Sequence, residues 1–449
     1  MITSDYNRGE PIKPDELQDL KEIADVEISN ITLDDFPNLL VFPDSFNTYD
    51  RDFGKKKVCS IINDEPTFGG KALKTNSIVG FIGRNNTHLS IHSRFSDDGK
   101  ADYFLHYMLQ KVAKINLFNL QHTFEEDNVF DFLLYLFPLY LKRAISQGVY
   151  RHYNTKKYND ANVRGVIDIN RHIKYNEPNN GNIAYTTREF SYDNHITQLI
   201  RHTIECISKY QVGEQILNID IDTQQAVSQI KSATPSYSSK ELLTIINKNL
   251  TPIAHPFYSE YTSLQRLCLQ ILRNEELKYG QEQDEIYGVL IDACWLWEEF
   301  LAVLLEGRYN HFLKDTGKRF FLFKPNEQQI IPDYLSFDKK IVADAKYIPL
   351  EQKTRFKDES VNAAAIYYKT ITYMYRFCSK TGFLLYPHQD HQVSPIKKEI
   401  ITEREGANGG TITELGLRIP SGSDNFASFS TLMNKYEQEF LAQCMPPSQ

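Results

Sequence analysis

Residues Gln328–Tyr347 read QQIIPDYLSFDKKIVADAKY. Two apolar runs, Ile330–Phe337 and Ile341–Tyr347, lie on either side of the polar pair Asp338-Lys339. Apolar runs of this length around a short polar turn are typical of a β-hairpin. We therefore expect the two runs to be neighbouring antiparallel strands, with the polar pair at the tip.

The hairpin would gather charged side chains on one face. Side chains alternate along a strand, so Asp344 and Lys346 share a face. With a symmetric tip, Leu335 pairs with Val342, and the same register places Asp333 opposite Asp344. The pattern thus predicts two carboxylates side by side, with an ammonium two residues from one of them.

These three charges point to a divalent cation. Buried charges cost free energy unless something compensates them, and carboxylate oxygens suit Mg²⁺ while a lysine holds the attacking water or the phosphate. Acid-x-Lys runs such as Glu276-Leu277-Lys278 are common in this chain, so Asp344-Ala345-Lys346 alone is a weak signal. The preceding Pro332-Asp333 makes it stronger, because Pro-Asp followed by Asp or Glu, any residue and Lys is the pattern of metal-dependent nucleases.

Composition limits the class of protein. At 449 residues the chain is long enough for two or three domains, and with 41% hydrophobic residues it has ample material for cores. Its formal net charge of −8 argues against general coating of nucleic acid, though not against a local basic groove. The six cysteines are scattered without a Cys-x-x-Cys pair, which indicates reduced thiols.

We expect a cytoplasmic protein without a membrane segment. No signal peptide opens the chain, and its most apolar segment, Val129–Leu141, is too short to span a bilayer. The sequence contains no Gly-x-x-x-x-Gly-Lys-Ser/Thr loop, no zinc-ligand spacing among its 12 histidines and no Gly-x-Ser-x-Gly elbow. Nucleotide hydrolysis of that type, zinc chemistry and serine hydrolysis are therefore not indicated.

The spacing of apolar residues changes along the chain and predicts three parts. Short β-like runs separated by Gly and Asn turns predict a β-rich domain over residues 1–118. Helical spacing dominates residues 119–255, where Tyr150–Gly165 mixes basic residues with tyrosines, as in a nucleic-acid contact or an exposed connector. The third part, residues 256–449, contains the hairpin in the order helix, hairpin, helix, strand.

The sequence also predicts the structure of two further segments of the third part. Tyr287–Leu305 is strongly apolar, and we expect one helix there. Its adjacent acids Glu298 and Glu299 point in different directions, so at most one faces the hairpin, and we select Glu298 as an accessory acid of the metal site. Ile400–Ser423 is rich in Gly and Thr and is expected to be mostly loop.

In their order along the chain, these segments resemble McrC, the nuclease subunit of McrBC-type restriction systems, and its relatives in LlaJI-like systems. The similarity covers SIVGFIGRNNTHLSIHSRF and DYFLHYML in the N-terminal part and REFSYDNHITQLIRHTIE in the middle. It continues through YGVLIDACWLWEEFL, IIPDYLSFDKKIVADAKY and FLLYPH. The Asp-Ala-Lys-Tyr run with a downstream Tyr-Pro-His is its most specific element.

The resemblance implies an α/β and α+β multidomain protein with a C-terminal PD-(D/E)xK restriction-endonuclease-like domain and an N-terminal β-rich plus helical adaptor region. It implies a Mg²⁺-dependent endonuclease, with Mn²⁺ as a substitute, in an anti-phage restriction complex. Such a subunit cuts double-stranded DNA when it is docked on an oligomer of McrB-like AAA+ GTPase subunits, whose hydrolysis it stimulates.

The resemblance also implies roles for single residues. Asp333 and Asp344 match the family's metal-binding acids, Lys346 matches its catalytic lysine, and Glu298 falls where many relatives have an acid on the preceding helix. As a hypothesis, Asp333, Asp344 and the Ala345 carbonyl bind the metal, and Lys346 positions the water.

The chain departs from the family at one position and leaves two alternatives open. Relatives often have a Gln after Tyr in the later helix, where this chain has Lys369 after Tyr368; a lysine there could contact phosphate instead. One alternative is a stand-alone or transposon-associated nuclease that uses the same hairpin. The other is a non-catalytic adaptor of an NTPase ring, against which the intact set of Asp333, Asp344 and Lys346 argues.

Overall fold

A computed structural model describes residues 1–7, 9–30, 38–42, 56–64, 70–85, 87–96, 102–113, 126–210, 213–277, 286–312, 320–348, 363–389, 394–402 and 409–444. They fall into two compact units, one formed by residues 1–129 with 283–449 and the other by residues 130–282. The three-part division expected from the sequence, with boundaries at 118/119 and 255/256, stays a prediction.

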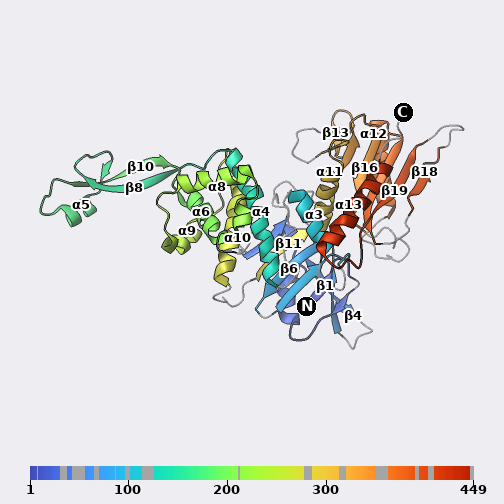
Figure 1. Ribbon diagram of the computed structural model, residues 1–449, viewed down its shortest axis with the longest axis horizontal. Coiled ribbons are helices and arrows are strands. Elements are labelled where there is room, and N and C mark those ends of the chain that lie inside the picture. Colours follow the sequence, from blue (N-terminus) through green and yellow to red (C-terminus); the bar gives the residue numbers. More distant parts are fainter. Residues whose placement is uncertain are drawn as a thin grey trace. The chain divides into compact units, whose positions relative to one another are not determined.

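The first unit begins with a five-stranded mixed sheet in the order β1-β7-β6-β11-β3. Figure 1 labels β1, β6 and β11 of this sheet. The pairs β1–β7 and β11–β3 are parallel, and the other neighbours are antiparallel. The strands are β1 (Ile2–Ser4), β3 (Asn38–Phe42), β6 (Ile78–Arg84), β7 (Thr87–His92) and β11 (Ile286–Asp292). Alternating apolar residues account for β6 and β7, which form the hairpin that the Gly and Asn turn predicts.

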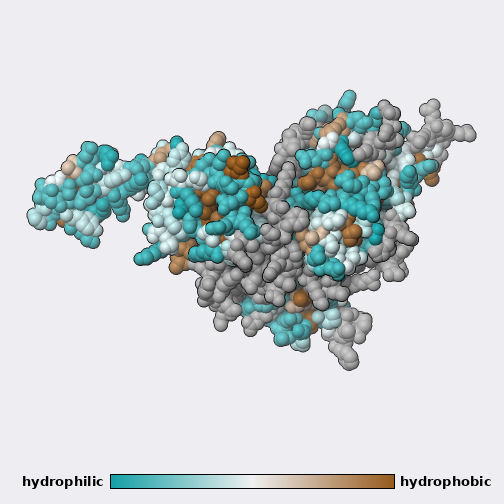
Figure 2. All heavy atoms as spheres, in the orientation of Figure 1, coloured by the Kyte–Doolittle hydropathy of each residue, from teal (hydrophilic) through white to brown (hydrophobic). Residues whose placement is uncertain are grey.

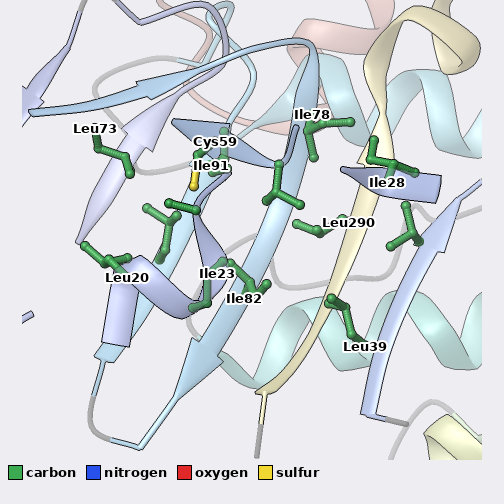
Figure 3. Packing of buried hydrophobic residues seen from close by; sticks show 14 residues of the cluster. Leu20, Ile23, Ile28, Leu39, Cys59, Leu73, Ile78, Ile82, Ile91 and Leu290 are labelled. Atoms are coloured by element: carbon green, nitrogen blue, oxygen red, sulfur yellow. The ribbon is translucent and has the colours of Figure 1, made fainter. Parts of the chain in front are cut away.

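β11 joins this sheet from far along the chain. Its Leu290 is fully buried among residues of the N-terminal part, Leu39 and Ile82 among them (Figure 3). The expectation of one helix over Tyr287–Leu305 is therefore wrong in its first part, because the chain completes β11 and only then enters α11 (Ala293–Leu304). A short continuous apolar run does not distinguish a buried strand from a buried helix.

Smaller elements surround the five-stranded sheet. A second, antiparallel sheet has the order β2-β5-β4. Its strands and the nearby helices are β2 (Glu10–Pro11), β4 (Cys59–Asp64), β5 (Gly70–Thr75), α1 (Leu17–Ile23), the 3-10 helix η1 (Ile28–Asn30) and α3 (Tyr103–Ala113). The buried Leu20 and Ile23 of α1 belong to the same cluster as Leu290 (Figure 3).

The first unit also contains a six-stranded sheet in the order β12-β15-β16-β17-β19-β18. β16, β17 and β19 are parallel to one another, and the remaining pairs are antiparallel. The strands are β12 (Tyr309–His311), β15 (Tyr334–Ser336), β16 (Ile341–Ala345), β17 (Thr381–His388), β18 (Ile396–Glu399) and β19 (Thr411–Arg418). A separate antiparallel pair consists of β13 (Phe320–Phe323) and β14 (Glu327–Ile330).

Helices cover both faces of the six-stranded sheet. On one face, Tyr373 and Met374 of α12 (Ala363–Phe377) pack in a buried cluster with Val342 and Leu384. On the other face lies α11, whose Glu298 carbonyl accepts a hydrogen bond from the Tyr334 hydroxyl. The closing helix α13 (Phe426–Gln443) contacts β19. The sheet is thus shielded from water around β16 and β17, where the predicted hairpin ends.

β19 corrects another expectation. Ile400–Ser423 was expected to be mostly loop, but Thr411–Arg418 forms a strand between β17 and β18. Ile412, Leu415 and Leu417 are buried, and threonine is β-branched, so this segment fits a strand despite its glycines. The strand expected after the hairpin and its following helix is confirmed by β17.

The second unit is mainly helical. Its helices are α4 (Glu126–Ser146), α5 (Ile169–Asn176), α6 (His195–Ile207), α7 (Gly213–Leu217), α8 (Ile221–Ala233), the 3-10 helix η2 (Ser239–Glu241), α9 (Leu242–Lys248) and α10 (Glu260–Leu277). Its strands are β8 (His152–Asp160), β9 (Val166–Ile167) and β10 (Ile183–Ser191). In the described part of the chain, no helix is both long and apolar enough to cross a membrane.

β8 and β10 form a long arm that extends from the helices of the second unit (Figure 1). The basic segment Tyr150–Gly165 lies largely in β8, where Lys156 pairs with Glu189 of β10 at 3.2 Å. The face of the arm seen in Figure 2 is mostly hydrophilic. This segment is therefore a paired strand, and whether it contacts nucleic acid stays a prediction.

Candidate metal and phosphate site

The predicted hairpin forms between β15 and β16, with a shorter first strand than expected. Leu335 pairs with Val342, which confirms the predicted register. The apolar run Ile330–Phe337 is not one strand, because the chain leaves β14 at Ile330 and starts β15 only at Tyr334. Pro332 lies in this break, and proline cannot donate a ladder hydrogen bond.

The turn of the hairpin is stabilised by its own side chains. Asp338 accepts hydrogen bonds from the Ser336 hydroxyl at 2.6 Å and from the Lys340 N–H at 3.0 Å. Ser336 in turn accepts from the Ile341 N–H at 3.0 Å. Aspartate and serine commonly close turns in this way, and here they fix the register that aligns the two strands.

The two carboxylates predicted to meet do so at the end of the hairpin opposite the turn. Asp333, directly before β15, accepts a hydrogen bond at its Oδ2 atom from the Ala345 N–H at 2.8 Å. Asp344, in β16, is fully buried. The ammonium of Lys369 reaches both acids, at 3.8 Å from Asp333 Oδ1 and 3.2 Å from Asp344 Oδ1.

Lys346 completes the group as the alternation along β16 predicts. Its Nζ atom forms an ion pair with Asp344 Oδ2 and donates to the Ala345 carbonyl at 3.2 Å. The structure therefore brings Asp333, Asp344, the Ala345 carbonyl and Lys346 together.

The pKa values of the two acids are shifted in opposite directions. Burial, and then the negative charges of Asp344 and Glu298, raise the pKa of Asp333 to about 8. Burial also opposes ionisation of Asp344, but the ammonium groups of Lys346 and Lys369 outweigh it and hold the pKa of Asp344 below its usual value. One acid is thus readily ionised and its neighbour resists ionisation, as expected for close carboxylates that share a buried site.

Glu298 lies beside the group but makes its own contact. This acid of α11 is half-exposed, and its carboxylate lies 3.3 Å from Nε2 of His311 in β12. Burial lowers the pKa of His311, but the hydrogen bond to Glu298 and the charges of Glu299 and Glu298 raise it overall above its usual value. Glu298 acts on Asp333 through its charge.

The donor set suits a hard cation with few protein ligands. Among the described residues, no three His, Cys, Asp or Glu side chains lie close enough together to hold a metal ion between them. Asp333, Asp344 and the Ala345 carbonyl offer oxygen atoms only, as Mg²⁺ prefers, and Mg²⁺ commonly keeps several waters. These residues fit such an ion, with Glu298 outside the group of direct donors.

Lys369, which the sequence marks as a candidate phosphate contact, is brought to the two acids by the fold. It lies in α12, beyond residues 349–362, and only the packing of α12 on the sheet brings it to the acids. Burial lowers the pKa of Lys369, but Asp333 and Asp344 raise it overall above its usual value. The signal in the sequence was its position after Tyr368 in a helix next to the hairpin.

Comparisons with known proteins find a matching family model and similar solved structures. A family model described as McrBC 5-methylcytosine restriction system component matches residues 73–387. A structure of Thermococcus gammatolerans McrB AAA+ hexamers with bound McrC contains a chain 14% identical to this one at a TM-score of 0.46, with 99% of this chain and 100% of that chain covered. A cryo-EM structure of the Thermococcus gammatolerans McrBC complex contains one 15% identical at a TM-score of 0.31, with 69% and 89% covered. No curated protein matches the chain.

Proposed function

Because this chain belongs to the McrBC 5-methylcytosine restriction system component family, we propose that it is the subunit of such a system that cuts DNA. The observation that carries the proposal is the meeting of Asp333, Asp344 and Lys346 at one end of a buried hairpin. The order α11, β15, β16, α12, β17 supports a PD-(D/E)xK endonuclease domain. Its substrate would be double-stranded DNA delivered by an oligomer of AAA+ GTPase subunits, whose hydrolysis it stimulates.

Asp333, Asp344 and the Ala345 carbonyl would hold Mg²⁺, or Mn²⁺ in its place. When bound, such an ion offsets negative charge that develops on the phosphate and makes a water more acidic. A protonated Asp333 binds a cation less well, so the raised pKa of Asp333 makes loading favourable above neutral pH.

The lysines act on the phosphate and the water. Hydrolysis joins a water oxygen to phosphorus, breaks the bond from phosphorus to one sugar oxygen, and leaves a water proton on that oxygen. Lys346, whose ammonium lies at Asp344, would orient the attacking water and offset charge on the phosphate. Lys369 is more exposed than Lys346 and would contact a neighbouring phosphate oxygen.

The test is cleavage of plasmid DNA by the full chain with its AAA+ GTPase partner, GTP and Mg²⁺. Asp344→Asn and Lys346→Ala should each slow cleavage roughly 100-fold or more, because each removes a group that acts on the reacting atoms. Stimulated GTP hydrolysis should stay at the wild-type rate. Lys340→Ala is a matched control, since Lys340 is an exposed lysine of the same hairpin.

The result also separates the alternatives. Cleavage at the wild-type rate by either site variant would sink the assignment of this site. Cleavage by the chain without the partner would favour a stand-alone nuclease. Stimulated GTP hydrolysis with intact DNA in the presence of Mg²⁺ or Mn²⁺ would favour a non-catalytic adaptor.

A further inference from the structure

The residue after Lys346 is held by the N-terminal part of the first unit. Tyr347 is buried, and its carbonyl accepts a hydrogen bond at 3.0 Å from Nη2 of Arg94, which follows β7. The Arg94 guanidinium also lies 4.3 Å from the centre of the Tyr347 ring. Ser93 Oγ is 3.2 Å from the Tyr347 hydroxyl. Two consecutive residues after β7 therefore fix Tyr347 at its backbone, ring and hydroxyl.

Arg94 is itself anchored to the five-stranded sheet. Its Nη1 atom donates to Asp5 Oδ2 at 2.8 Å, and its backbone N–H donates to Asp5 Oδ1. Asp5 directly follows β1, and its N–H donates to the His92 carbonyl of β7 at 2.8 Å. The planar guanidinium has enough donors to bond Asp5 and Tyr347 at once, which a lysine ammonium on a flexible stem does less well.

The backbone of Lys346 is also held by β17. Its N–H donates at 2.8 Å to the Leu385 carbonyl of β17. The same carbonyl accepts a hydrogen bond from Nε1 of Trp297 in α11 at 3.2 Å. The two-residue segment Lys346-Tyr347 is therefore held at both ends, by β17 at the Lys346 N–H and by Arg94 at the Tyr347 carbonyl, and from this segment the lysine ammonium reaches Asp344.

We propose that Arg94 is a positioning residue for Lys346. The contact Asp5–Arg94–Tyr347 holds the lysine backbone where its ammonium meets Asp344. This inference rests on the proposed function, in which Lys346 acts at the phosphate. The five-stranded sheet thus takes part in the site through Arg94, and a displacement at the ends of β1 and β7 is transmitted to Lys346 through Arg94 and Tyr347. A lysine that is displaced by a small distance loses much of its effect on rate.

The first test measures cleavage by the full chain with its AAA+ GTPase partner, GTP, Mg²⁺ and plasmid DNA. Arg94→Lys keeps a cation beside Asp5 but loses the simultaneous bond to Tyr347, so kcat should fall about tenfold while KM for DNA stays near the wild-type value. The double variant Asp5→Asn/Arg94→Met removes both charges without leaving one buried alone, and its kcat should fall at least as far.

Arg84 provides a matched control. Its side chain in β6 is 18% exposed, against 16% for Arg94, and it pairs with Glu22 at 4.0 Å. Arg84→Met should change kcat by no more than about twofold, because Arg84 has no contact with Tyr347 among those that the structure describes.

The second test measures the accessibility of the Lys346 side chain and does not depend on DNA cleavage. Lys346 of the metal-free chain is acylated with an N-hydroxysuccinimide ester, and its labelling rate is followed by peptide mass spectrometry. In Arg94→Lys the rate should rise about threefold or more, since a lysine that leaves its carboxylate is more accessible to reagent. Terbium luminescence should show wild-type Tb³⁺ affinity in Arg94→Lys and weakened affinity in Asp344→Asn.

The outcomes are distinct. Wild-type kcat in Arg94→Lys, or a reduced kcat with unchanged acylation of Lys346, would overturn the positioning role. A parallel loss of Tb³⁺ binding, thermal stability and cleavage in both Arg94 variants would show a merely structural role and would also overturn it. A wild-type complex that leaves DNA intact would overturn the proposed function instead, while the acylation rates would still support or refute the hold of Arg94 on Lys346.

Discussion

At the scale of single residues, Asp333 is the acid of the site that resists ionisation. Its side chain is 14% exposed, it lies beside Asp344 and near the charge of Glu298, and its pKa is raised to about 8. A carboxyl with a raised pKa keeps its proton in the folded protein at pH values where the unfolded chain has lost it. The contribution of Asp333 to the free energy of unfolding therefore falls as pH rises from about 4 to about 8.

Asp333→Asn should remove this dependence. Asparagine does not titrate and can still accept the hydrogen bond from the Ala345 N–H. Without metal, the free energy of unfolding of the variant should exceed that of the wild type by on the order of 1 kcal/mol or more at pH 8.5, and by little at pH 5.5. Thermal unfolding at both pH values checks this.

Asp338→Asn is the matched control in the same hairpin. Asp338 is exposed, and its pKa is lowered by hydrogen bonds from Ser336 and the Lys340 N–H. Asp338→Asn should therefore give no increase in the free energy of unfolding that becomes larger as pH rises. An equal gain for Asp333→Asn at pH 5.5 and pH 8.5 would contradict the raised pKa.

The residues of the site differ in how far the sequence could predict them. Asp333, Asp344 and Lys346 lie on two strands joined by a short turn, so alternation and register suffice to bring them together. Lys369 comes from a helix after an intervening segment, and Arg94 comes from the segment that follows β7 of a different sheet. Such contacts depend on packing between elements, which no local pattern specifies.

At the scale of elements, the pairing of β11 with β6 depends on close backbone approach. Gly288 in β11 adopts φ +152°, and a side chain there would collide with the Phe81 carbonyl of β6. Gly80 of β6 adopts φ +127° and meets the Val289 carbonyl in the same way. The two glycines lie on neighbouring strands, so β6 and β11 can pair at this distance only because both positions lack a side chain.

Gly288→Ala should therefore lower the free energy of unfolding by about 2 kcal/mol or more, through overpacking against backbone that cannot move aside. Gly307→Ala is the control, since Gly307 adopts φ +77° with open space where a side chain would lie. Gly307→Ala should lower the free energy of unfolding only by the strain of the left-handed conformation, roughly 1 kcal/mol. Urea unfolding measures both, and equal losses would show that close approach is unimportant at Gly288.

Elements with clear periodicity were predicted well, and continuous apolar ones were not. β6 and β7 follow their alternating patterns. The run Tyr287–Leu305 is apolar throughout, so its division into β11 and α11 was missed. The capping residue Asp292 was a signal for this division, because its side chain accepts from the Cys294 N–H at 3.0 Å where the helix begins.

At the scale of the whole molecule, the N-terminal sheet is not built from N-terminal residues alone. β11 lies between β6 and β3, and within the described residues β3 has β11 as its neighbour. The mixed α/β character follows from the sequence, but this insertion of a late strand does not, because pairing between strands more than 200 residues apart leaves no local trace.

A fragment of residues 1–118 should accordingly fail to fold by itself. It lacks β11, so β3 has no ladder and Leu39 loses Leu290 as a neighbour. Its amide NMR spectrum should be poorly dispersed, and joining residues 283–305 to it through a flexible linker should restore dispersion. A well-dispersed spectrum of the fragment alone, with slow exchange of the β3 amides, would refute this.

The late arrival of β11 has a consequence for synthesis of the chain. The ribosome synthesises residues 130–282, which form a continuous and compact unit, before it synthesises β11, the strand that pairs with β3 and β6. The middle of the protein can therefore assemble while its beginning is still incomplete. Arg94 and Tyr347 are brought together later still, because Tyr347 is made after β11, so the site forms only when most of the chain has been translated.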